Sequence, residues 1–160
     1  MVWSTPKTWV APSVPTAGDL NTHLRDQLNA IGGTWTSYTP TWTSSGSPAV
    51  GNGSLTGYYM QAGKLIHARI RLLIGSSTTI STGIYTFALP APAAALQYEC
   101  LGSAHMCDDS AGNYYPGIAY RPGTSSACSL VFGTARWSAS APVAPAQNDV
   151  IAVNLSYEAA

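Results

Sequence analysis

Three side chains that can ligate a metal ion stand at alternate positions in the second half of the chain, at His105, Cys107 and Asp109. Residues two apart on a β-strand point to the same face, so the three would converge if a strand continues to Asp109. Imidazole, thiolate and carboxylate groups are all zinc ligands. The sequence offers no evident fourth ligand and no evident partners to orient the ligands. We therefore interpret this segment as a strand that runs into an Asp-rich turn, and we expect no bound metal and no cofactor.

The seven acidic residues do not form a catalytic pattern. Glycoside hydrolysis needs two carboxyl groups that flank the scissile bond. Asp108 and Asp109 are adjacent, so on a strand they would point apart, and Asp19 and Asp26 fall in an expected helix. The motifs of nucleophile elbows, phosphate-binding loops and dinucleotide-binding folds are absent from the sequence. We expect no catalytic residue and no enzymatic activity.

Aromatic side chains are better candidates for ligand binding. Tyr114, Tyr115 and Tyr120, together with Trp137, could form a surface on which sugar rings stack. Large aromatic residues also pack well in a core or in a subunit interface, and we favour such packing for these four.

The charge content indicates a chain that lives in an assembly. Only 9% of the residues are charged, and seven basic and seven acidic residues give a net charge of zero. Such a chain has no basic surface for nucleic acid or for an anionic membrane. No stretch approaches the roughly 18 apolar residues of a membrane span. Proteins near zero net charge tend to associate, so we expect protein partners, without nucleic acid or membrane.

The first 15 residues are expected to form an extended arm without a core of its own. They contain Trp3, Trp9 and three prolines. Exposed tryptophans on such an arm usually need a partner surface. We expect Trp3 and Trp9 to attach the chain to another protein.

Residues 16–31 form the one expected helix. Thr16 followed by Asp19 is typical of a helix start, and Gly32-Gly33 is typical of a helix end. One face carries an apolar stripe, formed by Leu20, Leu24, Leu28 and Ile31. Because so short a helix is marginal alone, the stripe must pack on its own domain or on other copies of the chain. The spacing allows a short trimeric bundle.

From residue 34 onward the apolar residues alternate with a period of two, which predicts strands. Eight are expected, at 38–43, 55–60, 66–74, 84–89, 96–107, 114–121, 127–132 and 150–157. In the third, the residues from Ile66 to Ile74 alternate, and Arg69 and Arg71 should face solvent or a neighbouring subunit. Regularly spaced short strands predict an all-β fold, an antiparallel β-sandwich of about eight strands.

Two further expectations concern single residues in these strands. Pro116 should lie at an edge or a bulge, since proline cannot donate to a ladder. Cys100 and Cys107 would stand roughly 23 Å apart on one strand, too far for a disulfide. We expect these two cysteines and Cys128 to be buried free thiols.

Several separate blocks of sequence, in this order, carry a resemblance to a known family. They are Tyr38-Thr-Pro-Thr-Trp42-Thr, Gly51-Asn-Gly-Ser-Leu55-Thr-Gly57-Tyr-Tyr59, Gly63-Lys64, Phe87-Ala-Leu89-Pro90 and the closing strand from Asn148 to Glu158. Together they resemble the small β-sandwich domains of bacteriophage tail-fibre, head-fibre and minor structural proteins, especially those of phages of actinobacteria. The segment from Thr8 to Asp26 resembles the segment that often precedes such domains.

The resemblance implies a jelly-roll-like sandwich at residues 34–160, carried as a homotrimer on the surface of a virion. Residues 1–33 would then serve virion attachment and trimerisation, with other virion proteins as partners. The expected function is that of a virion structural protein: a head fibre, a capsid decoration, a short tail fibre or a minor tail protein. Head and tail both remain open. The alternative is a receptor-binding module that recognises a host cell-surface glycan.

Overall fold

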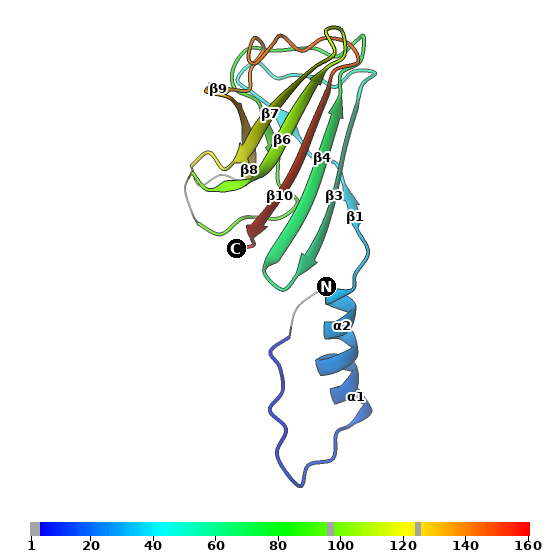
Figure 1. Ribbon diagram of the computed structural model, residues 1–160. Coiled ribbons are helices and arrows are strands. Elements are labelled where there is room, and N and C mark those ends of the chain that lie inside the picture. The colour runs from blue at the N-terminus through cyan, green and yellow to red at the C-terminus, as the bar shows by residue number, and fades with distance from the viewer. Residues whose placement is uncertain (1–3, 96–97, 124–125) are drawn as a thin grey trace.

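Ten strands follow one helix in the computed structural model, which describes residues 4–95, 98–123 and 126–160 (Figure 1). The helix consists of α1 (Ala17–Leu20), a π-helical turn (Asn21–Arg25) and α2 (Asp26–Ile31). The strands are β1 (Thr36–Tyr38), β2 (Trp42–Thr43), β3 (Ser54–Ala62), β4 (Leu65–Leu73), β5 (Thr86–Ala88), β6 (Cys100–Asp108), β7 (Asn113–Tyr120), β8 (Ala127–Phe132), β9 (Ala135–Arg136) and β10 (Val150–Glu158).

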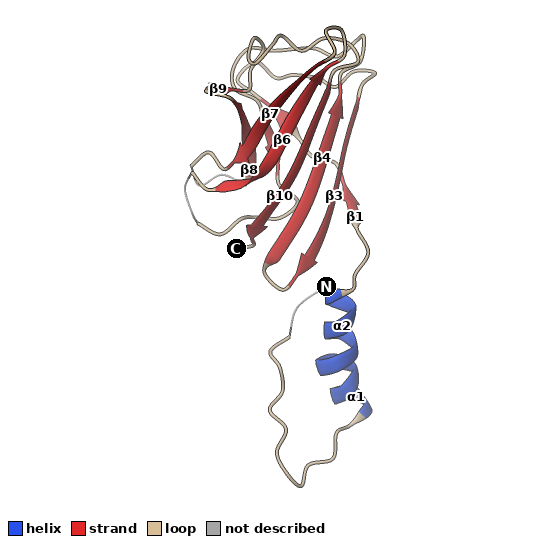
Figure 2. Cartoon of the chain, in the orientation of Figure 1, coloured by secondary structure: helices blue, strands red, loops and turns tan. Residues whose placement is uncertain are grey.

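The strands join one antiparallel sheet that curls into a half-barrel (Figure 2). Their order is β1-β3-β4-β10-β6-β7-β8-β5-β2, and β9 pairs with β8. The predicted all-β, sandwich-like fold is confirmed. Its two sides are not separate sheets, because β6, β7 and β8 continue the hydrogen-bonded ladder around the core. The C-terminal strand β10 lies near the middle of the order, between β4 and β6.

Strict alternation on the two central strands builds the core, as the sequence predicted. Even-numbered residues of β4 and odd-numbered residues of β10 point inward, where burial of an aliphatic side chain contributes about 1.5–3 kcal/mol. These inward residues are all buried: Ile66, Ala68, Ile70, Leu72, Ile151, Val153, Leu155 and Tyr157.

An aromatic cluster holds the short strands on the far side of the core. The Trp137 ring stacks on Trp42 with centroids 6.1 Å apart and an interplanar angle of 11°. Tyr85 meets the Trp137 ring edge-on at 4.7 Å, and Phe87 lies 5.3 Å from it. All four side chains are buried. Strands as short as β2 and β5 have few ladder hydrogen bonds, so this packing must supply much of their stability.

The predicted single strand at 38–43 is wrong, because the chain makes two strands there, on opposite edges of the sheet. β1 pairs with β3, whereas β2 pairs with β5. Pro40 is buried between them and has no amide hydrogen to donate to a ladder. From Tyr38 to Trp42 an extended chain spans at most roughly 14 Å. This short crossing therefore keeps the two edges of the curled sheet close together.

Two single-residue expectations have different outcomes. β7 pairs with β8 only over Gly117–Tyr120, so Pro116 lies just outside that ladder, in the part of β7 that pairs with β6 alone. Its predicted edge position is confirmed. The three cysteines are free, but Cys128 is buried, Cys107 is half-buried and Cys100 is exposed. The prediction of three buried thiols is therefore wrong for Cys100, which precedes a β-bulge at the start of β6.

The predicted helix is present, with the predicted start. Thr16 and Asp19 form a capping box: the Asp19 amide donates to Thr16 Oγ1, and the Thr16 amide donates to the Asp19 carboxylate. A π-helical turn interrupts the α-helical pattern where the Asp26 amide donates to the Asn21 carbonyl. The helix ends at Ile31, with Gly32 at its C-cap. Figure 1 shows it projecting beyond the end of the sheet.

Candidate functional site

The apolar stripe of the helix is exposed. Leu20, Leu24, Leu28 and Ile31 are 45%, 55%, 60% and 55% exposed, respectively. In Figure 2 the helix extends away from the strands, so the sheet does not cover this stripe. Of the two expected packing partners, the chain's own domain is therefore excluded. Among the described residues, the stripe has no packing partner.

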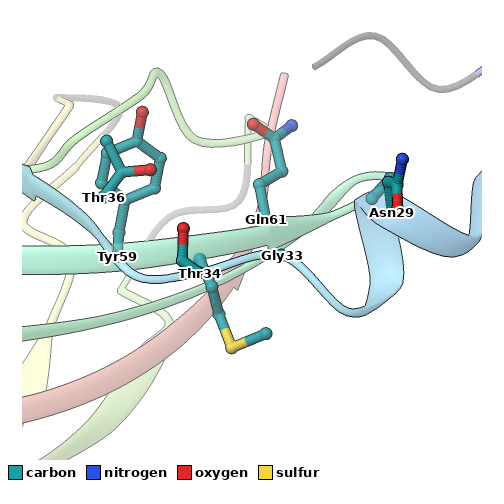
Figure 3. Close-up of a pocket in the computed structure, with 8 residues that line it drawn as sticks. Asn29, Gly33, Thr34, Thr36, Tyr59 and Gln61 are labelled. Atoms are coloured by element: carbon teal, nitrogen blue, oxygen red, sulfur yellow. The ribbon is translucent and has the colours of Figure 1, made fainter. Parts of the chain in front are cut away.

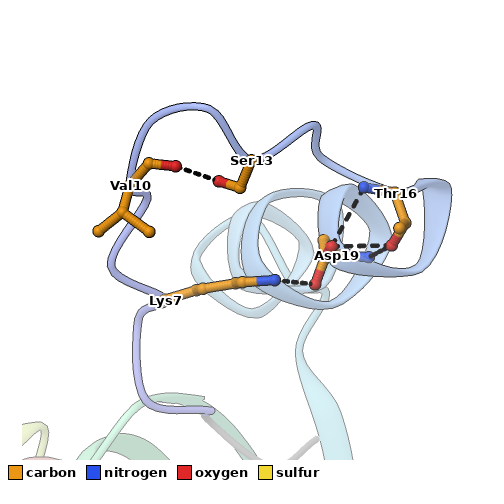
Figure 4. Close-up of polar contacts among 5 residues, drawn as sticks. All are labelled: Lys7, Val10, Ser13, Thr16 and Asp19. Carbon is orange, nitrogen blue, oxygen red and sulfur yellow. Dashed lines mark hydrogen bonds and ion pairs between the residues drawn. The ribbon is translucent and has the colours of Figure 1, made fainter.

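The N-terminal arm packs against a different face of the helix. Lys7 Nζ lies 2.5 Å from Asp19 Oδ1 (Figure 4). The Gln27 side chain donates to Ser4 Oγ at 2.6 Å. The Trp9 ring meets His23 edge-on, with centroids 6.5 Å apart. These contacts lie on the side where the helix residues are partly buried, namely Asp19, His23, Asp26, Gln27 and Ala30.

One carboxylate joins the arm to the start of the helix. The hydrogen bond from Lys7 holds the pKa of Asp19 well below its usual range, and the bonds from Thr16 act in the same direction. Figure 4 shows Lys7 and Thr16 meeting at this carboxylate, with the chain turning at Ser13, whose hydroxyl donates to the Val10 carbonyl. Arm and helix therefore form one hairpin-like unit, and the Asp19 carboxylate stays ionised in it at pH values where an ordinary Asp already takes up a proton.

The expectation for the arm is confirmed in part. No helix or strand occurs between residues 4 and 15, so the arm is extended as predicted. It does, however, find a partner in its own helix, because Trp9 contacts His23 and lies 5.1 Å from Lys7 Nζ. Trp9 remains 46% exposed. Trp3 lies outside the described residues.

A polar pocket separates the end of the helix from β3. It has a volume of about 260 Å³ and is lined by Asn29, Gly33, Thr34, Thr36, Tyr59 and Gln61, with Ala30 and Met60 (Figure 3). None of these eight side chains is charged, and none is a His or Cys. Such a lining suits the joint between helix and sheet better than it suits catalysis.

The four aromatic residues considered as a sugar-stacking surface, for which packing in the core or an interface was favoured, do not lie together. Trp137 is fully buried in the core cluster and is removed from any surface site. Tyr114 and Tyr115 are neighbours on β7 and point to opposite faces: Tyr114 is 71% exposed, whereas Tyr115 packs against the core. Tyr120 is half-buried. The Cys107 side chain raises the pKa of Tyr114, since the two residues are cross-strand partners.

The three residues with metal-ligating side chains, His105, Cys107 and Asp109, are divided between a strand and a turn. His105 and Cys107 lie on β6, which ends at Asp108, and Asp109 follows in the turn. The Asp109 amide donates to the buried Asp149 carboxylate, and Asp108 accepts hydrogen bonds from Ser110 and Ala111. Within the described ranges, no three His, Cys, Asp or Glu side chains are grouped so that they could hold a metal ion.

Outward-facing residues of β3, β4 and β10 form a surface around two arginines that the sequence did not predict. Arg69 lies 4.5 Å from the Trp35 ring and 5.2 Å from the Tyr58 ring, and Arg71 is exposed beside it. Alternation on β4 correctly placed both arginines outward. Nothing in the pattern indicated that Trp35, which precedes β1, would fold over the same face.

Comparisons with known proteins add no further assignment. No family model matches the chain, and neither a curated protein nor a solved structure proved similar to it. No helix in the described part of the chain is long and apolar enough to cross a membrane.

Proposed function

We propose that this chain is a structural protein of a bacteriophage particle, a homotrimeric surface appendage or decoration such as a head fibre, a capsid decoration, a short tail fibre or a minor tail protein. The observation that carries the proposal is the exposed stripe of Leu20, Leu24, Leu28 and Ile31 on a helix outside the sandwich. An apolar stripe of this kind needs a partner. Three copies of the same helix would cover it symmetrically.

The available burial is sufficient for association. Full burial of a Leu or Ile side chain contributes about 1.5–3 kcal/mol, and roughly half of each stripe residue is still exposed. Burial of the remainder in a bundle would contribute about 3–6 kcal/mol per chain. A net charge of zero adds little repulsion between copies.

The resemblance to phage fibre and minor structural proteins supports the location on a virion. The sequence blocks that carry it fall on the elements that organise the fold: the crossing from β1 to β2, the hairpin of β3 and β4, and β10 in the middle of the sheet. On this proposal the arm and helix attach the trimer to the capsid or tail, and the sandwich projects outward.

Incorporation into particles tests the attachment role. We expect that deletion of residues 1–15, or Trp9→Ala, yields a folded sandwich that particles no longer carry in normal amounts. Trp9 is 46% exposed, so its replacement leaves the core intact. Tyr98→Ala is the matched control, because Tyr98 is 74% exposed and lies far along the chain from the arm. Normal incorporation of the truncated chain would show that the sandwich itself docks. Electron cryomicroscopy of particles would then assign the chain to head or tail.

The alternative function is recognition of a host cell-surface glycan. Tyr114 favours it, because this ring is 71% exposed on β7. A glycan array probed with the wild-type protein and with Tyr114→Ala separates the two functions. Loss of a glycan signal in the variant would support receptor binding through this ring. An array on which the wild-type protein gives no signal would support the structural role only.

A further inference from the structure

The outer face of the sheet carries a pocket beside two arginines. Arg71 is flanked across the ladders by Thr56 of β3 and Ala152 of β10, and Arg69 is flanked by Tyr58 and Asn154. Because Thr56 and Ala152 are small, they leave a hollow of about 310 Å³ next to the Arg71 side chain. It is lined by Thr56, Tyr58, Arg69, Ile70, Arg71, Ala152, Val153 and Asn154.

One aromatic side chain, Tyr58, lines this pocket, and a second, Trp35, lies beside Arg69 outside the lining. The Trp35 ring is 4.5 Å from the Arg69 guanidinium carbon and meets His67 edge-on at 5.4 Å. The His67 ring is in turn hydrogen-bonded to Ser156 Oγ at 2.8 Å. Trp35 is 37% exposed, so its indole is both held in place and open to solvent. The Arg69 guanidinium packs against two aromatic rings, Trp35 and Tyr58. The Arg71 guanidinium is therefore the group that can donate hydrogen bonds to a ligand.

No carboxylate balances the arginines among the described residues. The residues that flank Arg69 and Arg71 on the neighbouring strands are neutral, and His105 lies two strands away from Arg71. Glu158 is outward too, but it lies at the far end of β10, where it pairs with Lys64. The acidic residues are committed elsewhere: Asp19, Asp26 and Glu158 form ion pairs, and Asp108 and Asp149 are buried. Only Glu99 and Asp109 remain, so a second copy of this chain offers no acidic patch to match the face.

We propose that this face binds a carboxylate-bearing saccharide, with Arg71 holding the carboxylate and a sugar ring lying against the Tyr58 side chain, which lines the pocket and is 39% exposed. A guanidinium fork matches one carboxylate through two parallel hydrogen bonds. Asn154 and Thr56 lie within the same pocket and suit sugar hydroxyl groups. The volume is at the lower end of the roughly 300–1,000 Å³ of ligand sites, which suits one or two rings.

Other anions fit less well. Nucleic acid would need a wider basic surface, because its binding grows with the number of phosphates neutralised, and this face offers two arginines. A phosphate dianion calls for more free donors than Arg71 alone supplies. The site uses residues other than Tyr114, and it does not depend on the assembly role, since the isolated protein suffices for its test.

Calorimetric titration with trigalacturonic acid tests the proposal, with its fully methyl-esterified form as the uncharged control ligand. We expect the acid to bind about tenfold or more tightly than the ester, since hydrogen bonds to charged groups are the stronger ones. Arg71→Gln should weaken binding of the acid by about tenfold or more, and Tyr58→Ala should weaken binding of both ligands. Arg136→Gln, a substitution of an exposed arginine on β9, should leave binding unchanged.

Three results would overturn the proposal. They are equal binding of acid and ester, equal effects of Arg71→Gln and Arg136→Gln, and no binding of the acid at about 10 mM. Tighter binding of mannose 6-phosphate than of the acid would overturn the carboxylate assignment. Amide chemical shifts of the wild-type protein provide a readout that needs no variant: changes on titration must centre on residues 69–71 and 152–154. A change in oligomeric state on Arg71→Gln, without a change in saccharide binding, would assign this face to a subunit interface instead.

Discussion

Replacement of two stripe residues should convert a trimer into monomers. The test is the double variant Leu24→Gln/Leu28→Gln. In the single wild-type chain the two leucines are 55% and 60% exposed, so the substitutions remove only the burial that a bundle would add. At about 1.5–3 kcal/mol for a fully buried Leu, the lost burial is about 2–3 kcal/mol per chain, or roughly 5–10 kcal/mol per trimer. Glutamine amides placed in an apolar bundle cost more, because they lack hydrogen-bond partners there.

Sedimentation equilibrium at about 10 µM should therefore give three times the chain mass of 16.7 kDa for the wild-type protein and one chain mass for the double variant. The control is Leu65→Gln, because Leu65 is 56% exposed at the start of β4, on the sandwich. It should remain trimeric. Circular dichroism of the strands should not change in either variant. A wild-type monomer at this concentration, or a double variant that stays trimeric, would refute the reasoning that the stripe holds copies together.

Three further expectations concern stability. Trp137→Ala should lower the free energy of unfolding by about 3–5 kcal/mol in chemical denaturation, as expected for a large side chain removed from a core, whereas Trp35→Ala should cost far less. Burial raises the pKa of Cys128 to about 12 from an ordinary value of 9.0, so the unfolded chain loses this proton first and stability should fall as the pH rises from about 9 to about 12. Thermal melts of Cys128→Ala should show a shallower decline, and an equal slope would contradict this account. Thr16→Ala should destabilise the helix start by about 1 kcal/mol, seen as faster hydrogen exchange of the first-turn amides, and Thr22→Ala, which removes no cap, should not reproduce it.

Local patterns predicted the central elements because these elements obey local rules. On β4 and β10 every inward position is apolar, and any shift by one residue would expose the whole set, so the register could be read directly. The helix start at Thr16 and Asp19 was likewise predictable, since the capping box is formed by residues three apart. The same is true of the edge position of Pro116, which follows from its missing amide hydrogen.

The candidate sites were predicted less well because they depend on contacts between distant segments. Tyr114, Tyr115, Tyr120 and Trp137 could be grouped by chemistry, but alternation does not tell which face of a late strand meets the core. Trp137 stacks on Trp42, from a strand at the other end of the sequence. The contact between Arg69 and Trp35 could not be predicted for the same reason, since Trp35 lies outside any alternating segment.

The sequence by itself determined the all-β class, the inward faces of β4 and β10, the helix with its apolar stripe and the outward placement of Arg69 and Arg71. These features follow from periods of two and of three to four residues and from side-chain chemistry, which act within a few residues. Only the tertiary structure decided that one sheet curls on itself, that Pro40 divides a strand between two edges, that the arm covers the His23 side of the helix and that the leucine stripe stays open. These depend on which surfaces meet in space, and burial is decided by the whole chain packing at once rather than by any short segment.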